Sequence, residues 1–521
     1  MEKTNNHPPL LTEILSNWLT KAFRVHRVPF LASLFWGVLA YMFAFTNKLV
    51  NHDEVGQLFA KGATHSSGRW GLGALDLIFP NVSMPWIYGI ITMLCIAVAI
   101  CLIIDIFSIR SKPLQVLLSA SIMVFPSLIG VFGYMFTSSC YGVSFLLAVL
   151  SIWVLCRPWK LAVLPALACL IGSVSIYQAY ISVAASLLVL VLIQKLLVGE
   201  DPLLILKKGI GYVLFLIVGL GGYYLLTRLI MITKHIPFNE YAADSISFSI
   251  SYLPKGIRLA YSSFFQFFYM PYFRLIPTEF SQKLHILLLA VAAILLLLWA
   301  LKQKKPCATR FLLLLALIGV LPLAVNCLYM ITVETSIHTL VLYSFIAVYI
   351  LIIMLADLFA AEMQTKKLAE LLRRLCVDCI ALVMVVVIMI NVYTANAAYL
   401  NMHLRYENTY SFFTSLTAQI RQMPEFKEGT KLAVIGIWKY PDFYEQHLEF
   451  TYYLTGVGGF MPTTYTAYRF MEYYIGFPAV FASAEEMAAI QQTEEFQNMP
   501  LYPYYGSIGV INDTIVVKLS E

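Results

Sequence analysis

Apolar runs of about 20 residues recur along most of this chain, and they constrain its fold more than any other feature. An α-helix of about 20 residues crosses the hydrocarbon core of a bilayer, so each run is a candidate membrane span. The composition agrees, because 60% of the 521 residues are hydrophobic and 12% are charged, whereas soluble domains are about half apolar and about a quarter charged. The sequence therefore predicts an all-α membrane protein with many spans.

About eleven spans can be marked in the sequence. The first, residues 28–46, is expected to be retained, because no small-residue cleavage site of a signal peptide follows it. The others are expected at 86–107, 113–136, 139–156, 161–177, 180–198, 210–232, 284–301, 310–330, 338–356 and 376–395. The two runs that flank Tyr177-Gln178 are also compatible with a broken or re-entrant unit.

Positive charges predict how the chain is oriented in the membrane. Residues 1–27 carry Lys21, Arg24 and Arg27, which assigns the N-terminus to the cytoplasmic side. With this start, the later clusters of Lys and Arg also fall in inside loops. The short outside loops carry neither residue type; they are 137–139, 178–179 and 331–337. An odd number of spans then places the C-terminus outside.

Three long segments are therefore expected on the outer face: residues 47–85, the aromatic-rich residues 233–283, and residues 396–521. We expect the aromatic side chains of the second segment to lie at the membrane interface, where Tyr and Trp are enriched. The third segment has the composition of a soluble domain, with strands expected at 431–436 and 513–519 and helices at 398–423 and 484–496. We predict a small α/β domain at 396–521, after a transmembrane domain at 28–395.

The first outside loop carries an unusual polar cluster next to the membrane, which includes His52, Asp53, Glu54, His65 and Arg69. Asp53 is a good N-cap for a short helix that would stop near Gly62, and Glu54 would complement the dipole of that helix. A second short helix is expected between Gly68 and Pro80. Caps alone do not require so many ionisable groups beside a bilayer, where such groups are commonly functional.

A carboxylate at this position can serve as a general base. It would take the proton from a sugar hydroxyl as the hydroxyl oxygen attacks an activated carbon. A nearby Arg would hold a phosphate leaving group and stabilise its developing charge. A donor that arrives through the lipid, such as a lipid-linked phosphosugar, fits this location.

The arrangement resembles the GT-C superfamily of integral-membrane glycosyltransferases and, more narrowly, the bacterial type II glucosyl transferase family. The residues that carry the resemblance are the acidic pair Asp53-Glu54 and the segment Gly68-Arg69-Trp70, which leads into "LGALDLIFP". Many family members have an Asp-Asp pair where this chain has Asp-Glu. The span pattern agrees over residues 28–395, whereas residues 396–521 match no family that we can name.

The resemblance implies a multi-pass protein of the bacterial plasma membrane that transfers a hexosyl unit, most simply glucosyl, with inversion. The donor would be a polyprenyl-phosphate sugar, and the acceptor would be a cell-envelope glycan such as O-antigen on the outer face. Asp53 is the first choice for the catalytic base, and Glu54 is the second. Arg69 would contact the donor phosphate or sugar. The resemblance does not decide whether a divalent metal, Mg²⁺ or Mn²⁺, is needed. Asp53 and Glu54 are the carboxylates that would bind such a metal.

Further residues expected on the outer side could bind the donor phosphate or the sugar, and each has a simpler structural explanation. An Arg near a membrane surface extends its charge to the interface, aromatic residues sit at that depth, and polar residues cap helices. The candidates are His65, Tyr177, Gln178, Arg228, Arg258, Arg274, Glu334 and His338.

Three other functions compete with the transferase. A flippase or transporter of lipid-linked saccharides would carry ionisable residues inside its spans, whereas the charges here gather near the outer ends. A polymerase of lipid-linked saccharides would carry its basic residues in large outside loops, and a membrane scaffold would only present residues 396–521. The net charge of +6 lies in short patches between spans, which does not fit nucleic-acid binding.

Overall fold

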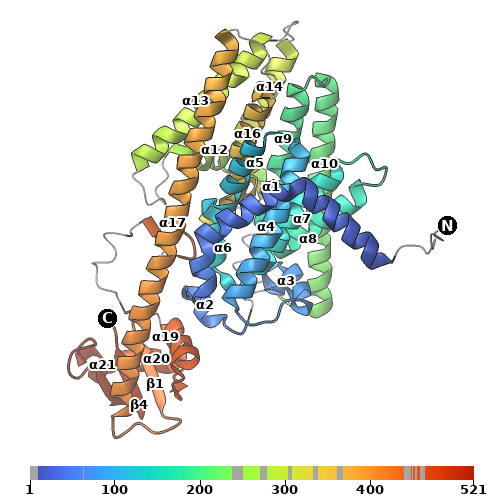
Figure 1. The fold of residues 1–521 in the computed structure, drawn as a ribbon. Helices are drawn as coiled ribbons and strands as arrows, with labels where there is room; N and C mark the ends of the chain where they lie inside the picture. Colours follow the sequence, from blue (N-terminus) through green and yellow to red (C-terminus); the bar gives the residue numbers. More distant parts are fainter. Residues whose placement is uncertain are drawn as a thin grey trace, which may run out of the picture.

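The computed structural model is mostly helical and contains a bundle of apolar helices with a small sheet at one end (Figure 1). It describes residues 10–60, 62, 64–237, 250–269, 278–302, 308–331, 338–360, 368–438, 448, 450–451, 454–457 and 464–520. Within these ranges, nine helices are long and apolar enough to cross a membrane, or ten if one bent pair counts as a span. The predicted polytopic helical fold is confirmed, with fewer spans than the expected number of about eleven.

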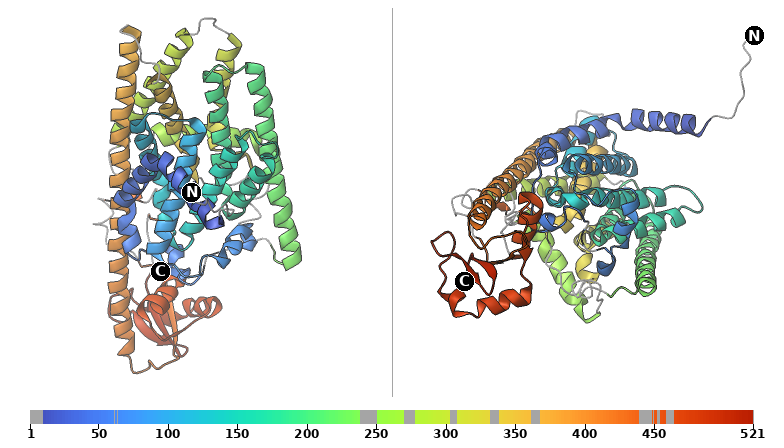
Figure 2. Two further views of the ribbon diagram at one scale, coloured as in Figure 1. Left: turned by 45° about the vertical axis from the view of Figure 1, so that its right-hand side comes forward. Right: turned by 90° about the horizontal axis from the view of Figure 1, so that it is seen from below.

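The long helices of the bundle are α1 (Leu11–Thr46), α4 (Pro85–Phe107), α7 (Met135–Leu155), α9 (Ile181–Leu197), α10 (Pro202–Lys234), α13 (Thr278–Lys302), α14 (Ala308–Val325), α16 (Ile346–Ala360) and α17 (Leu368–Arg421). The core of the bundle is built around α9 and α16, whose side chains are almost all buried. By contrast, α10 exposes most of its apolar side chains. The first part of α1 projects beyond the bundle (Figure 2).

Two of the expected spans differ in the structure. The run 113–136 forms two helices, α5 (Lys112–Met123) and α6 (Pro126–Gly133), which are bent by 43°. The break follows from Pro126, because the residue before a proline is driven out of the helical conformation, and Phe125 is extended.

The run 161–177 forms only α8 (Val163–Ile176), whose 14 residues are fewer than a span needs. This helix ends because Tyr177 is extended. A single 3₁₀ turn, η3 (Gln178–Tyr180), then leads into α9. The alternative of a broken unit at the Tyr-Gln element therefore describes this region better than two full spans do.

The aromatic segment 233–283 is only partly as expected. Its described part includes α12 (Leu253–Tyr269), in which Phe267 and Phe268 are buried. Phe267 stacks on Phe125 with ring centroids 5.6 Å apart, and Phe268 stacks on Phe345 at 6.0 Å. These rings therefore pack inside the bundle and do not form an interfacial shelf.

One helix of 54 residues, α17, replaces the span expected at 376–395 and the helix expected at 398–423. Its sequence contains neither Gly nor Pro, so nothing interrupts the helix where the composition changes from apolar to polar. At about 1.5 Å per residue it is about 80 Å long, and it runs along one edge of the molecule into the C-terminal sheet region (Figures 1 and 2). The predicted division between residues 28–395 and 396–521 thus falls inside a continuous helix.

The C-terminal region contains a four-stranded mixed sheet in the order β2-β1-β4-β3. Its strands are β1 (Lys431–Ile435), β2 (Val480–Phe481), β3 (Ile508–Ile511) and β4 (Thr514–Lys518), and its helices are α19 (Thr464–Phe470), α20 (Ala484–Gln491) and α21 (Glu494–Asn498). Both predicted strands are confirmed. The helix expected at 484–496 is divided, because Thr493 caps a new helix.

The first loop lies at the same end of the bundle as this sheet region (Figures 1 and 2). It forms α2 (His52–Gly56), η1 (His65–Ser67), α3 (Trp70–Ala74) and η2 (Leu75–Leu77). The orientation predicted from the positive charges requires these two parts to share one face of the membrane. Their common location agrees with that requirement.

Candidate functional site

The acidic pair lies on α2, and the residue that caps this helix is Asn51. Its Oδ1 atom accepts hydrogen bonds from the backbone N–H groups of Asp53 at 3.0 Å and Glu54 at 2.8 Å. The prediction that Asp53 is the N-cap and that the helix runs to Gly62 is therefore wrong, since α2 ends at Gly56. Asp53 is the second residue of the helix, so capping does not occupy its carboxylate.

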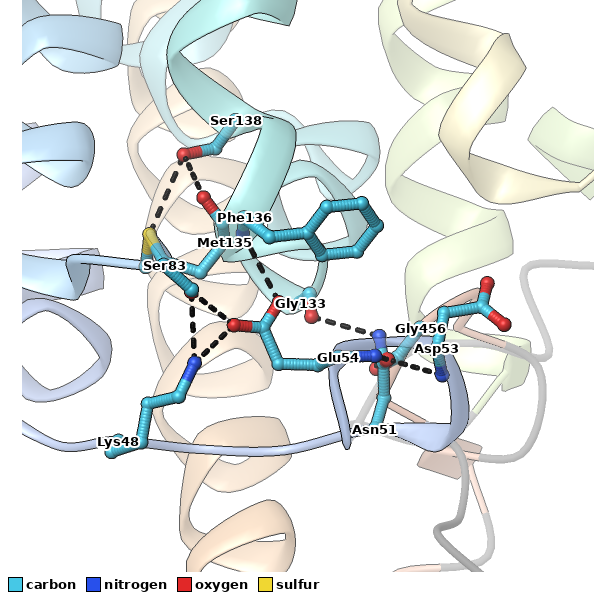
Figure 3. Close-up of polar contacts among 10 residues, drawn as sticks. All are labelled: Lys48, Asn51, Asp53, Glu54, Ser83, Gly133, Met135, Phe136, Ser138 and Gly456. Atoms are coloured by element: carbon cyan, nitrogen blue, oxygen red, sulfur yellow. Dashed lines mark hydrogen bonds and ion pairs between the residues drawn. The ribbon is translucent and has the colours of Figure 1, made fainter. Parts of the chain in front are cut away.

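Glu54 points into the protein and is fully buried, with 0% of its side chain exposed. Lys48 Nζ and Ser83 Oγ both donate to its Oε1 atom. The backbone N–H of Phe136 donates to Oε2 at 3.1 Å (Figure 3). Phe136 lies in the first turn of α7, where the helix dipole also favours a negative charge. These contacts compensate the burial of the carboxylate and fasten α2 to the bundle.

Asp53 points away from Glu54, and 57% of its side chain is exposed (Figure 3). One of its oxygens lies 3.5 Å from Nδ1 of His52. The hydrogen bond to this carboxylate raises the pKa of His52, although partial burial opposes the shift. The acidic pair thus consists of one buried, fully engaged carboxylate and one carboxylate that is open to incoming molecules.

Arg69 and Asp53 both act on one tyrosine, although sixteen positions separate them in the sequence. The charges of Asp53 and Arg69 both act on the hydroxyl of Tyr141, which also shares a hydrogen bond with Arg69. The guanidinium group of Arg69 lies 5.5 Å from the ring centroid of Tyr177. A cation at this distance from an aromatic face is attracted to it. Tyr141 and Tyr177 therefore hold the Arg69 side chain.

Tyr223, Gln178 and Thr227 hold the segment around Arg69. Tyr223 donates its hydroxyl hydrogen to the carbonyl oxygen of Gly68 at 3.1 Å. Gln178 donates to the carbonyl oxygen of Ser67 at 3.0 Å and to the Tyr223 hydroxyl at 3.1 Å. Trp70 donates from Nε1 to Thr227 Oγ1 at 3.1 Å. Gly68 itself has φ of +71°, a left-handed conformation that favours glycine. Gln178, predicted as a sugar contact, thus holds the loop that carries Arg69.

His65 and Arg228 lie near the end of α10 that faces this loop. His65 Nε2 lies 3.0 Å from Lys234 Nζ, and burial together with the charge of Lys234 lowers the pKa of His65. Arg228 is exposed one position after Thr227, and its Nε atom donates to the Tyr224 hydroxyl at 3.0 Å. His65 therefore contacts the end of α10 through Lys234, and Arg228 lies one position from the Thr227 contact with Trp70.

The remaining candidates lie on other elements or outside the described residues. Arg258 is exposed on α12, and His338 is the N-cap of η5 (Thr339–Phe345). Arg274 and Glu334 fall outside the described residues. In the described part of the chain, no three His, Cys, Asp or Glu side chains gather as metal ligands. Because Asp53 and Glu54 diverge, the pair does not fit a metal ion that both would bind.

Sequence reasoning missed Asn51, Ser83, Tyr141 and Tyr223, and it did not pair Lys48 with Glu54. Asn51 had a usable signal, because Asn is as good an N-cap as Asp and directly precedes the helix. The two tyrosines had none, since an aromatic residue inside an apolar run is expected to pack in the core.

Comparison with known families supports a single assignment. A family model described as glucosyl transferase GtrII matches residues 42–351, which is more than half of the chain. The matched part begins within α1, includes Asp53, Glu54 and Arg69, and ends within α16. No curated protein and no solved structure matches the chain. This match agrees with the bundle of apolar helices and with the polar loop that follows the first of them. The chain therefore belongs to the GtrII family of glucosyl transferases.

Proposed function

We propose that this glucosyl transferase moves a glucosyl unit from a polyprenyl-phosphate sugar to a cell-envelope glycan, with Asp53 as general base. The observation that carries the proposal is the placement of Asp53. Its carboxylate is exposed on a capped helix that is anchored through Glu54, and its charge acts on the same tyrosine as the charge of Arg69.

The reaction would be a single displacement at the anomeric carbon. Asp53 takes the proton of the acceptor hydroxyl while its oxygen forms the new glycosidic bond. The bond between the anomeric carbon and the phosphate oxygen breaks on the opposite face, which inverts the configuration and releases polyprenyl phosphate. We assign the base to Asp53 and not to Glu54, because both oxygens of Glu54 already accept hydrogen bonds inside the protein.

Arg69 is suited to the phosphate of the donor. A guanidinium group binds phosphate oxygens in pairs and remains charged at every relevant pH. Tyr177 and Tyr141 support the side chain, and Tyr223 and Gln178 hold the backbone, so little ordering is needed when the phosphate arrives. Arg228, one position beyond the Thr227 contact, is the second candidate for the same phosphate.

The neighbourhood of α10 supports a donor that arrives from the lipid. Leu225, Leu229 and Ile232 are exposed on this helix, within two turns of Thr227. Exposed apolar side chains of this kind are expected to face acyl chains when a helix lies in a bilayer. A lipid-linked sugar can therefore place its chain against α10 while its phosphate reaches Arg69. We further infer that this end of the bundle, with residues 396–521, faces the outside of the bacterial plasma membrane.

Transfer from polyprenyl-phosphate glucose by the purified protein tests the proposal. We expect Asp53→Asn to reduce turnover about 10²- to 10⁴-fold, the usual contribution of a general base. Asp76→Asn is the matched control, because Asp76 is another exposed carboxylate of the same loop, and it should retain turnover. Full activity of Asp53→Asn rules out Asp53 as the base. Movement of the lipid-linked sugar across vesicles without any transfer product would instead support a flippase.

A further inference from the structure

Asn51 connects three parts of the chain that are far apart in the sequence. Its side chain is buried, with only 6% of the residue exposed. Besides capping α2 through Oδ1, it donates from Nδ2 to the carbonyl oxygen of Gly133 at 2.8 Å and to that of Gly456 at 3.1 Å (Figure 3). The two donor hydrogens and two acceptor positions of the amide are thus all in use.

The two glycines allow one amide to reach both carbonyl groups. Gly133 ends α6, and Gly456 belongs to the C-terminal region. A Cβ atom at Gly133 would lie 2.9 Å from the carbonyl oxygen of Gly456, and one at Gly456 would lie 2.6 Å from the Tyr134 ring. The bundle and the C-terminal region are therefore in direct backbone contact at the point where Asn51 binds them both.

The C-terminal region also supplies the apolar surface on which α2 rests. Val55 and the preceding Val50 are buried in the same hydrophobic cluster as Phe413, Phe470 and Met471. Phe59, just after α2, packs edge-on against Tyr473 with ring centroids 5.4 Å apart. Glu54 fastens α2 to the bundle, Val55 fastens it to the C-terminal region, and Asn51 is bonded to both.

We propose that Asn51 is a positioning residue through which the C-terminal region sets the location of the Asp53 carboxylate. The C-terminal region would then be a structural part of the catalytic assembly, although it lies outside the part of the chain that matches the GtrII family. This inference rests on the proposed function in so far as it takes Asp53 as the reacting group. A displacement of about 1 Å in such a group lowers a rate by up to about 10²-fold.

Asn51→Asp separates the two roles of the side chain. The carboxylate still accepts the hydrogen bonds that cap α2, but it cannot donate to Gly133 or Gly456. We expect kcat to fall about 10- to 100-fold, with KM for the polyprenyl-phosphate donor unchanged. Asn326→Asp is the matched control, because Asn326 is 2% exposed and its Nδ2 donates to the carbonyl oxygen of Ala260 at 2.8 Å, in another part of the bundle. The control should retain kcat.

Val55→Ala tests the same connection from the apolar side. It leaves every hydrogen bond of Asn51 in place and loosens only the packing of α2 on the C-terminal region. We expect a smaller fall in kcat than in Asn51→Asp, again with KM for the donor unchanged. A rise in KM without a fall in kcat, in either variant, would mean that α2 serves donor binding and would overturn the proposal.

Hydrogen exchange measured by mass spectrometry separates this inference from the proposed function. Amide exchange across residues 52–56 should be faster in Asn51→Asp, which keeps the cap of α2, than in the wild type and unchanged in Asn326→Asp. Unaltered exchange in Asn51→Asp would overturn the inference whatever the activity. In the Asp53→Asn background, Asn51→Asp should cause no further loss of turnover. If Asp53→Asn is itself fully active, the assignment of the base fails, while the exchange result still decides the role of Asn51.

Discussion

Replacing Glu54 by Gln should damage stability far more than chemistry. The substitution removes the charge that Lys48, Ser83 and the Phe136 N–H share, and it leaves the Lys48 ammonium group beside a neutral amide. Removing one partner of a buried ion pair costs about 3–5 kcal/mol in the free energy of unfolding. Because 24% of the Lys48 side chain is exposed and water can screen the orphaned charge, we expect about 2–3 kcal/mol.

Unfolding in mixed micelles with increasing SDS measures this loss, and a double-mutant cycle assigns it to the pair. Lys48→Met removes the orphaned charge, so Lys48→Met/Glu54→Gln should be more stable than the sum of the single losses predicts, by about 1–2 kcal/mol. Strictly additive losses would show that the ion pair does not hold α2 in place.

Turnover of the folded fraction tests the other half of the reasoning. Glu54→Gln that remains folded should keep turnover within about tenfold of the wild type, against the loss of about 10²- to 10⁴-fold expected for Asp53→Asn. Glu54→Gln could instead have the same free energy of unfolding as the wild type and lose turnover as completely as Asp53→Asn does. Glu54 would then be the base, and the division of roles proposed for the pair would be wrong.

Two further predictions concern the groups around Asp53 and Arg69. The hydrogen bond to Asp53 raises the pKa of His52, so the imidazolium form engages the Asp53 carboxylate at low pH and releases it as the pH rises through that raised pKa. His52→Gln should therefore shift the acidic limb of the pH–rate profile to lower pH. An unchanged limb would contradict the role of Asp53 as a base that His52 engages. Tyr223→Phe removes the hydrogen bond to the Gly68 carbonyl, worth about 1 kcal/mol, and should raise KM for the donor about fivefold, whereas Tyr212→Phe, on the same helix, should leave KM unchanged.

Much of the fold could be predicted because its signals are local. A run of about 20 apolar residues identifies a span without knowledge of its neighbours, and the strands β1 and β4 show in short apolar segments. The break at Pro126 has a local cause in the proline itself, although one continuous span was expected at 113–136. The length of α17 is harder to predict, since it combines two segments of different composition, and only the lack of Gly and Pro indicates that the helix continues.

The residues of the candidate site could be chosen from the sequence, but the contacts that hold them could not be predicted. The acidic pair and the Gly68-Arg69-Trp70 segment were identifiable, whereas their supports, Tyr141 and Tyr223, come from apolar helices that the loop meets only after folding. The choice of the N-cap shows the same limit. Asn51 and Asp53 have similar intrinsic value as caps, and the difference arises because only an amide can also donate to the carbonyl groups of Gly133 and Gly456.

The geometry of a helix gives two adjacent carboxylates different roles. An α-helix turns by about 100° per residue, so consecutive side chains project in different directions and cannot share one environment. On α2 one direction leads to the N-terminus of α7 and Lys48, where a buried charge is compensated, and the other leads away from the bundle contacts, where Asp53 is exposed. The buried carboxylate fixes the helix, and the fixed helix holds the exposed one. A doublet of acidic residues beside a membrane therefore need not mean a pair of catalytic groups, since one of the two can be the anchor that makes the other effective.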